Sequence, residues 1–161
     1  MTVTVTELQE VDIEEVDRHL PLSRLDQQAR EGSTYLIAWE GDRPVGHAHI
    51  AWDRTHLALP EIQDVFVLPE RRRLGIASQL TRAAEEEARS RGWDRISLSV
   101  SRSDNQAAAQ LYAKLGYADA GVEPVRMLGQ IMLRGKPFDV DDTLVYLVKE
   151  LRGTGPPKLP G

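Results

Sequence analysis

An apolar strand runs into a proline, three arginines and a glycine-initiated helix over residues 65–78, with the sequence VFVLPERRRLGIAS. The proline ends the strand because it has no N–H to donate to a neighbouring strand. After Gly75 the apolar residues Ile76, Leu80, Ala83, Ala84 and Ala88 recur at the spacing of an amphipathic helix. A further strand is expected at residues 96–100, so this part of the chain predicts a β-α-β unit.

The rest of the chain surrounds this unit with further strands and helices. Alternating β-branched and apolar residues predict strands at 2–6, 34–39, 44–52, 62–67, from 117 onward and at 144–151. Helical spacing predicts helices at 11–20, at 23–31 and from Asp104 or Asn105 onward. The predicted fold class is therefore α+β, with a mixed sheet and helices on both of its faces.

Two features refine this prediction. In the helix after Gly75, Glu85 with Arg89 and Glu87 with Arg91 form i,i+4 pairs that are expected on its solvent face. Residues 1–152 are expected to form one domain, and residues 153–161, rich in Gly and Pro, a loose tail. The connection at 122–143 shows no regular pattern and is expected to be irregular.

Composition excludes several classes of protein. The 161 residues carry a net charge of −5, which argues against nucleic-acid binding and leans slightly towards cationic small molecules. There is no cysteine, hence no disulfide, thiolate metal site or cysteine nucleophile. His19, His47, His49 and His56 lack the spacing of a metal motif, and His47 and His49 are expected to share a strand face. No secretory signal or membrane span is visible, so a cytoplasmic protein is expected.

The start of the helix at Gly75 is a candidate phosphate site. The first backbone N–H groups of a helix are unpaired and carry partial positive charge, which favours bound phosphate. Gly75 and Ala77 are small, and Arg71, Arg72 and Arg73 add positive charge. The alternative is a solvated turn with a glycine at a tight corner. Neither the P-loop pattern nor the three-glycine dinucleotide pattern is present.

Two motifs in this sequence resemble signatures of one family. Residues 72–77 (RRLGIA) match Gln/Arg-x-x-Gly-x-Gly/Ala, and residues 105–117 (NQAAAQLYAKLGY) match Asn-x-x-Ala-x-x-x-Tyr-x-x-x-Gly-Phe/Tyr. Both are signatures of the GNAT (Gcn5-related N-acetyltransferase) superfamily, and the chain resembles this family best over residues 34–121. The resemblance implies a mostly antiparallel sheet with a central, splayed parallel pair of strands, at 62–67 and 96–100.

The resemblance also implies acetyl-CoA as cosubstrate, and no metal. The backbone of the 62–67 strand would pair with the pantetheine arm, and the turn would hold the pyrophosphate. Asn105 would touch the CoA arm, although asparagine is also a favoured helix N-cap. The implied cofactor-binding residues are Val65, Phe66, Val67, Arg72, Arg73, Leu74, Gly75, Ile76, Ala77, Ser78 and Asn105.

Two residues have implied catalytic roles. Tyr112 resembles the general acid that protonates the departing CoA thiolate, and it also lies on the apolar stripe of its helix, as a core tyrosine would. Glu61 stands where histone-acetylating members carry their glutamate base; the alternative is an exposed glutamate at a strand end. Asp53, His56, Asp139, Asp141 and Asp142 are further candidates on the acceptor side.

The resemblance implies direct transfer of acetyl from acetyl-CoA, in a ternary complex, to a primary amine of a small molecule or peptide. Members that acetylate ribosomal-protein N-termini often carry a glutamate before the asparagine helix, and residues 98–100 (LSV) have no carboxylate, which argues against that class. In the 122–143 connection, Met127, Ile131, Met132 and Phe138 either cover the acceptor pocket or belong to a small helix packed on the sheet. Family members often dimerise, which leaves a homodimer open.

Two other functions remain open on the sequence. The first is a non-catalytic acyl-CoA-binding or sensing module on the same fold, because fold does not imply function. The second is a nucleotide-binding domain that uses the same helix N-terminus, which leaves the Asn105 and Tyr112 helix unexplained.

Overall fold

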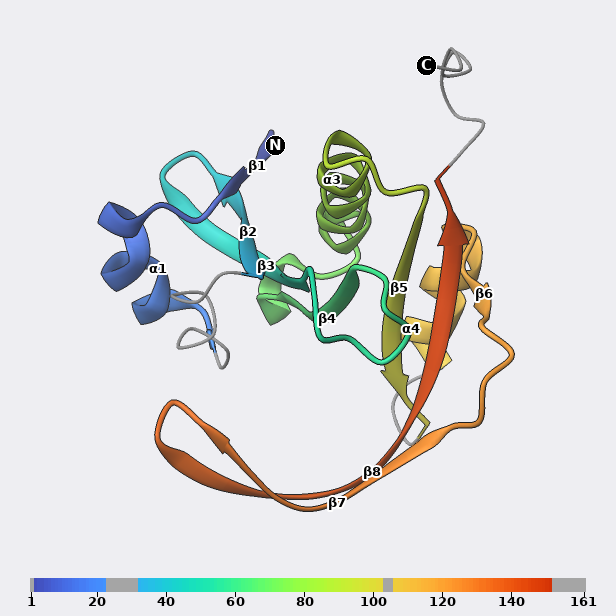
Figure 1. The fold of residues 1–161 in the computed structure, drawn as a ribbon. Coiled ribbons are helices and arrows are strands. Elements are labelled where there is room, and N and C mark those ends of the chain that lie inside the picture. The colour runs from blue at the N-terminus through green and yellow to red at the C-terminus, as the bar shows by residue number, and fades with distance from the viewer. Residues whose placement is uncertain (1, 23–31, 103–105, 152–161) are drawn as a thin grey trace.

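The computed structural model describes residues 2–22, 32–102 and 106–151 (Figure 1). The helix predicted at 23–31, Asn105 and the predicted tail lie outside these ranges. The elements are β1 (Val3–Glu7), a 3-10 turn (Glu10–Asp12), α1 (Ile13–His19), β2 (Ser33–Glu40), β3 (Arg43–Ala51), β4 (Glu61–Val67), a 3-10 turn (Pro69–Arg71), α3 (Ile76–Ser90), β5 (Arg95–Ser101), α4 (Gln106–Lys114), β6 (Ala118–Asp119), β7 (Val125–Leu133) and β8 (Lys136–Glu150). Among the described helices, none is long and apolar enough to cross a membrane.

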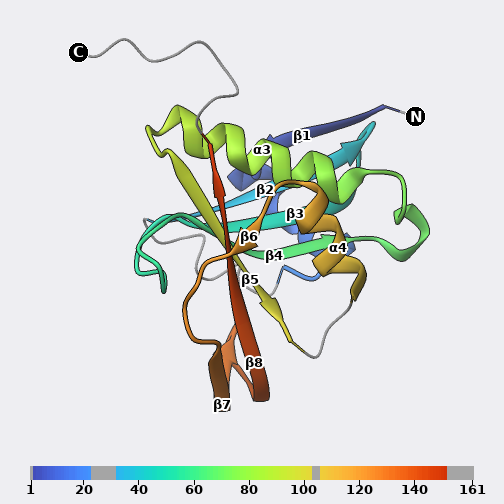
Figure 2. The same cartoon turned by 90° about the vertical axis from the view of Figure 1, so that its right-hand side faces the viewer.

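One sheet organises the molecule, in the order β1-β2-β3-β4-β5-β8-β6, with β7 paired to β8. All of these neighbours are antiparallel except β4 and β5, which are parallel because α3 carries the chain back across the sheet between them (Figure 2). The predicted fold class, an α+β fold with a mixed, mostly antiparallel sheet, is confirmed.

The parallel pair β4 and β5 is splayed. Among the described residues, backbone pairing joins the two strands at Glu61 with Ser97 and at Ile62 with Leu98. Further along, β4 continues to pair with β3 as far as Val67, whereas β5 pairs with β8 as far as Ser101. The backbone edge of β4 that faces away from β3 is therefore left open where the strands separate.

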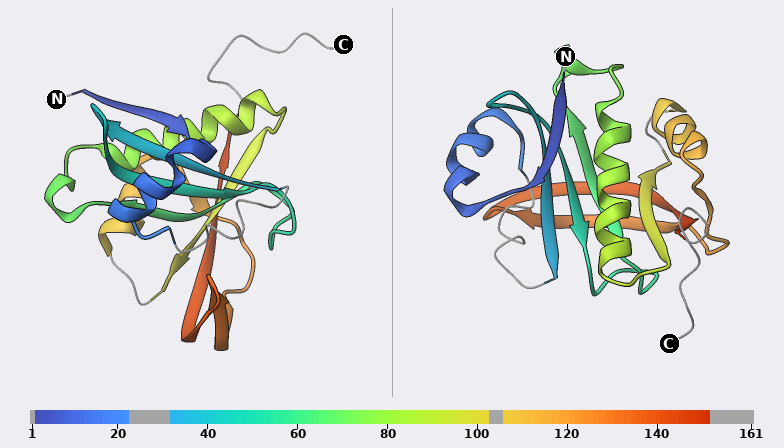
Figure 3. Two further views of the ribbon diagram at one scale, coloured as in Figure 1. Left: turned by 90° about the vertical axis from the view of Figure 1, so that its left-hand side faces the viewer. Right: turned by 90° about the horizontal axis from the view of Figure 1, so that it is seen from above.

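The two faces of the sheet carry different helices (Figure 3). On one face α3 packs against the larger core cluster, which includes Ile50, Ile62 and Leu98. On the other face α1 packs against a smaller cluster that includes Tyr35 and Ile37. Because each face is covered by its own helix, the two faces can hold different chemistry.

The polar contacts of α3 differ from those predicted. Glu87 and Arg91 pair as expected, with Oε1 and Nε 3.1 Å apart. Glu85 was expected on the solvent face beside Arg89, but it is 2% exposed and accepts hydrogen bonds from Tyr117 and Lys149, while Arg89 pairs with Glu86. The prediction for Glu85 was wrong because its partners lie far away in the sequence.

The stretch at 122–143, expected to be irregular, is mostly a long β-hairpin. It is formed by β7 and the first part of β8, and Figure 1 shows it sweeping away from the body of the sheet. Arg134 and Gly135 form its turn with φ of +52° and +77°, the left-handed conformation of a two-residue hairpin turn. The alternative of a small helix is wrong. Leu128 and Met132 interrupt the apolar–polar alternation on the outer face, which hid the strand pattern in the sequence.

The hairpin is tied back to α1 at its tip. The Arg134 guanidinium donates to both carboxylate oxygens of Asp17, with Nη1–Oδ1 of 2.5 Å and Nη2–Oδ2 of 2.9 Å. On the hairpin's inner face, Ile131 opposes Phe138 and Gly129 opposes Val140. This face continues along β8 through the half-buried Asp142 to Leu144, so the hairpin extends the α1 side of the sheet.

Candidate active site

A cleft of about 470 Å³ opens where β4 ends and α3 begins. Pro69 ends β4 and starts a 3-10 turn, and the chain then passes through left-handed residues Arg73 and Gly75, with φ of +65° and +81°. Gly75 is the N-cap of α3 and has no side chain that could cap the helix. The first amides of α3 therefore carry no side-chain cap and border the cleft, as an anion site requires.

The three arginines of the turn have different surroundings. Arg71 donates to both carboxylate oxygens of Glu40, at 2.8 and 3.2 Å, which anchors the turn to β2. The Nε of Arg72 donates to the carbonyl of Val67 at 3.0 Å and its guanidinium carbon lies 5.7 Å from the Phe66 ring centroid. Arg73 is exposed and makes no ion pair with another described residue. Arg71 and Arg72 thus shape the turn, and Arg73 has its charge available at the cleft.

Tyr112 stands on the α4 wall of the same cleft, next to Ala108 and Leu111. It is 8% exposed, and burial raises the pKa of its phenol to about 12. A phenol with this pKa stays protonated at neutral pH, so Tyr112 can donate a proton but not accept one there. The ring also belongs to the core cluster, which confirms the reading of Tyr112 as a core tyrosine, while its role as general acid stays a prediction.

The structure therefore brings most of the residues expected to bind the cofactor to one place. Leu74 is an exception, because its side chain is 54% exposed and does not line the cleft. Asn105 lies outside the described residues. Of the expected cofactor and catalytic residues, the lining contains Val65, Phe66, Val67, Arg72, Arg73, Gly75, Ile76, Ala77, Ser78 and Tyr112.

Glu61 lies apart from the cleft, at the start of β4. It is 6% exposed, so the reading as an exposed strand-end glutamate is wrong. Its neighbour Ile62 packs in the α3 cluster, and alternation along the strand turns Glu61 to the α1 face. Gln63 Nε2 donates to Glu61 Oε2 at 3.2 Å, while Gln63 Oε1 lies 3.2 Å from Nδ1 of the buried His49.

A register shift in the sheet produces this arrangement. His49 pairs with Asp64 and Ile50 with Ile62, so β4 has one residue more than β3 at this point. Strict alternation would place Val65 on the α1 face with Glu61 and Gln63, and because of the bulge it lies instead on the α3 face and lines the cleft. The bulge thus separates the beginning of β4, with Glu61 and Gln63 on the α1 face, from its end, which lines the cleft.

Tyr146 of β8 is a candidate that the sequence analysis did not identify. It is 7% exposed, and burial together with the Glu61 charge raises its pKa. The His56 ring stacks on it with a centroid distance of 4.4 Å. The alternation along 144–151 predicts a strand there. The strand with which it pairs is decided by the tertiary structure, and this pairing places Tyr146 near Glu61.

The remaining acidic candidates are spread out. Asp53 is exposed, and Asp139 and Asp141 lie exposed on the outer face of the hairpin, where Asp141 pairs with Arg126. Asp142 is half-buried and accepts a hydrogen bond from Ser101 Oγ at 2.6 Å. Among the described residues, no group of three or more metal-ligating side chains is placed to hold a metal ion.

Comparisons with known proteins agree with this geometry. The chain aligns over 96% of its length with the ribosomal-protein-S18-alanine N-acetyltransferase of Escherichia coli, covering 97% of it, with a TM-score of 0.69 and 18% identity. An aminoglycoside 6'-N-acetyltransferase complexed with coenzyme A aligns with a TM-score of 0.70 and 16% identity. The alignment covers 95% of this chain and 99% of that enzyme. A Bacillus subtilis acetyltransferase in complex with CoA aligns with a TM-score of 0.67 and 21% identity, over 92% of this chain and 99% of that one. At these identities the likeness shows the fold.

The sequence comparison shows the family. A search of curated proteins found no match. A profile described as the acetyltransferase (GNAT) family matches residues 3–117, well over half of the chain. The chain belongs to the acetyltransferase (GNAT) family.

Proposed function

We propose that this protein is an N-acetyltransferase that moves the acetyl group of acetyl-CoA to a primary amine of a small molecule or peptide. The observation that carries the proposal is a single cleft in which the uncapped amides of α3, the open edge of β4 and the buried phenol of Tyr112 come together. Membership of the acetyltransferase family and the CoA bound in two of the similar structures support it.

Each part of the cleft suits one part of acetyl-CoA. The pyrophosphate would lie on the amides at the start of α3, with Arg73 adding charge. The pantetheine arm would pair with the backbone of Val65 to Val67, where β4 has lost β5 as a neighbour, in the manner of an added strand. The thioester would then lie within reach of Tyr112.

The acceptor would approach from the α1 face, where Glu61, Gln63 and Tyr146 gather. An ammonium ion must lose a proton before its nitrogen can attack, and Glu61 would take this proton directly or through water. The nitrogen then bonds to the thioester carbonyl carbon and loses its second proton to water. The carbon–sulfur bond breaks, Tyr112 gives its proton to the thiolate, and solvent protonates the phenolate again, so the products are the acetylated amine and the CoA thiol. The apolar inner face of the hairpin, including Ile131 and Phe138, would contact the body of the acceptor.

Tyr112→Phe tests the proposal. The variant keeps the ring and its packing, so folding and acetyl-CoA affinity should be unchanged. Single-turnover transfer should slow by roughly 10²- to 10⁴-fold, because only the proton donor is lost. The measurement is rapid-quench thiol release with the best acceptor from a panel of aminoglycosides, polyamines, amino acids and N-terminal peptides.

Two outcomes would contradict it. If the wild-type protein binds acetyl-CoA but releases no thiol above hydrolysis with any amine, it is a binding module rather than an acetyltransferase. If a folded Tyr112→Phe variant keeps the full single-turnover rate, Tyr112 is a core residue and not the general acid.

A further inference from the structure

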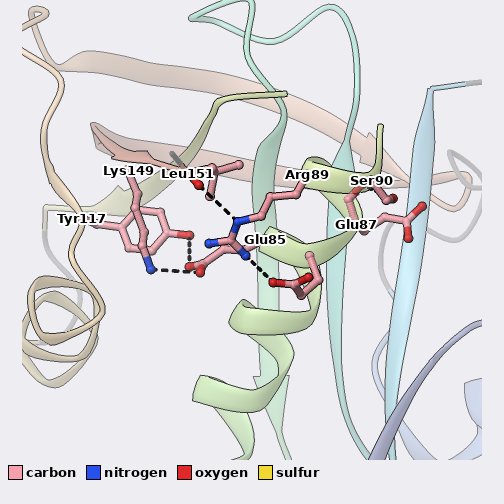
Figure 4. A network of polar contacts seen from close by, with 8 residues as sticks. Glu85, Glu87, Arg89, Ser90, Tyr117, Lys149 and Leu151 are labelled. Atoms are coloured by element: carbon pink, nitrogen blue, oxygen red, sulfur yellow. Dashed lines mark hydrogen bonds and ion pairs between the residues drawn. The ribbon is translucent and has the colours of Figure 1, made fainter. Parts of the chain in front are cut away.

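Glu85, in the middle of α3, is a buried carboxylate that the proposed reaction does not use. It is 2% exposed. Its Oε2 accepts a hydrogen bond from the Tyr117 hydroxyl at 2.8 Å, and its Oε1 accepts one from Lys149 Nζ at 2.9 Å (Figure 4). Three elements that are distant in the sequence, α3, the segment after α4 and β8, therefore meet at one side chain.

Such a group is a poor means of stabilising the fold. Removing a carboxylate and an ammonium from water carries a large desolvation penalty, and a well-packed apolar residue often serves stability equally well. The ion pair with Lys149 and the hydrogen bond from Tyr117 give both carboxylate oxygens of Glu85 a partner. Both bonds are directional, whereas an apolar side chain at this position could be buried by packing alone. What the directional bonds add is a defined position for the partners.

The partner whose position matters is Tyr117. Its ring stands edge-on to the ring of Tyr112, with centroids 5.9 Å apart and an interplanar angle of 74°. Its backbone N–H donates to the Tyr112 carbonyl at 2.9 Å. Lys149 Nζ lies 5.7 Å from the centroid of the Tyr117 ring. Tyr117 is thus held on one side by Glu85 and Lys149 and contacts Tyr112 on the other.

The same helix also carries the proposed pyrophosphate site. Glu85 lies nine residues after Ile76, about 14 Å along the helix axis from the start of α3. A helix of this length is stiff. The hydrogen bond from Tyr117 to Glu85 therefore fixes the position of Tyr112, which Tyr117 contacts, relative to the amides at the N-terminus of α3.

We propose that Glu85 and Tyr117 are positioning residues for the transfer reaction, which hold the Tyr112 hydroxyl at a set distance from the cofactor turn of α3. This rests on the proposed role of Tyr112 as general acid. Neither residue touches the substrates; both act through the ring of Tyr112. Misplacement of a reacting group by about 1 Å can cost up to roughly 10²-fold in rate, so the effect is large enough to measure.

Tyr117→Phe is the main test, because it keeps the ring that contacts Tyr112 and removes only the hydroxyl bonded to Glu85. We expect unchanged acetyl-CoA affinity by calorimetry and single-turnover transfer slowed by roughly tenfold. Glu85→Gln should slow transfer by less, because the amide oxygen can still accept the Tyr117 hydrogen bond. Glu87→Gln, which changes an exposed pair on the same helix, is the matched control and should leave the rate unchanged.

Repeating Tyr117→Phe in the Tyr112→Phe background separates positioning from general damage to the fold. If Tyr117 acts through the Tyr112 hydroxyl, it should have no further effect once that hydroxyl is absent. An equal loss in both backgrounds, or a folded Tyr117→Phe variant with the wild-type rate, would overturn the inference alone. A full rate in Tyr112→Phe itself would overturn the proposed general acid and this inference together. Tyr117→Phe carries the test if Glu85→Gln does not fold.

Discussion

Gly75 has a left-handed backbone conformation and lies at the proposed pyrophosphate site. Its φ of +81° suits glycine, and a Cβ built on it would meet no atom within 4 Å among the described residues. Asn and Asp tolerate this left-handed conformation better than other residues. A substitution here therefore tests charge with little steric disturbance.

We expect Gly75→Asp to weaken acetyl-CoA binding by at least about tenfold relative to Gly75→Asn. The two variants carry the same backbone strain, and they differ in a negative charge beside the proposed pyrophosphate site. Calorimetry at two salt concentrations measures the difference, which should shrink as salt rises. Equal affinities of the two variants would show that the pyrophosphate lies elsewhere.

The proposed role of Glu61 is to take a proton from the acceptor amine, in a buried position beside Gln63. Glu61→Gln keeps its size and can still accept the hydrogen bond from Gln63, but it cannot take a proton. At neutral pH we expect kcat/KM for the amine to fall by roughly 10²- to 10⁴-fold. An amine with a pKa near about 10 deprotonates by itself as pH rises, so the variant should gain rate with increasing pH up to that value.

A matched control for Glu61 is Glu150→Gln, which neutralises an exposed glutamate at the end of β8 and should have no effect. If Glu61→Gln is folded and keeps the wild-type kcat/KM at neutral pH, the base is another group or water alone. In that case Glu61 is a buried structural carboxylate.

Among the elements, the hairpin of β7 and β8 is tied at its tip to another element by a charged pair. The bidentate pair of Arg134 with Asp17 joins its tip to α1. Arg134→Gln should loosen this closure and raise KM for the acceptor several-fold, with acetyl-CoA affinity unchanged. Stability should change by less than about 1 kcal/mol, because the pair is partly exposed.

Arg126→Gln is the control for the hairpin, since it breaks an exposed pair with Asp141 within the hairpin itself. Steady-state kinetics and thermal unfolding of both variants decide the matter. An unchanged acceptor KM in Arg134→Gln, measured with acetyl-CoA saturating, would show that closure of the hairpin does not contribute to acceptor binding.

At the scale of the whole molecule, we propose that two substrates approach from opposite faces of the sheet and meet where β4 and β5 splay apart. The proposed cofactor cleft lies where β4 ends and α3 begins, and the polar group around Glu61 lies on the α1 face. Both substrates can therefore be bound at once, and the chain has no cysteine to carry an acetyl group. We expect intersecting initial-rate plots, and no label on the protein after incubation with radiolabelled acetyl-CoA alone. Parallel plots with a trapped acetyl-enzyme would exclude direct transfer.

The local parts of this structure followed from the sequence. Alternation identified the strands of the central sheet, and the Pro69 to Gly75 turn and the spacing of Ile76, Leu80 and Ala84 identified the start of α3. These signals are local because a backbone hydrogen bond in a helix, a turn angle or a strand face is set by residues a few positions apart. The two motifs placed Tyr112 and the turn in one family, and hence near one cleft.

Only the tertiary structure decided which polar residues became buried and with whom. Glu85 had a plausible local partner in Arg89, yet its actual partners are 32 and 64 residues away. Glu61 came to lie near Tyr146 because β5 and β8 pair beside β4, and the bulge at Gln63 put Glu61 and Val65 on opposite faces of the sheet. The free energy that brings these segments together comes from burying apolar side chains of distant segments, and no local pattern in the chain records it.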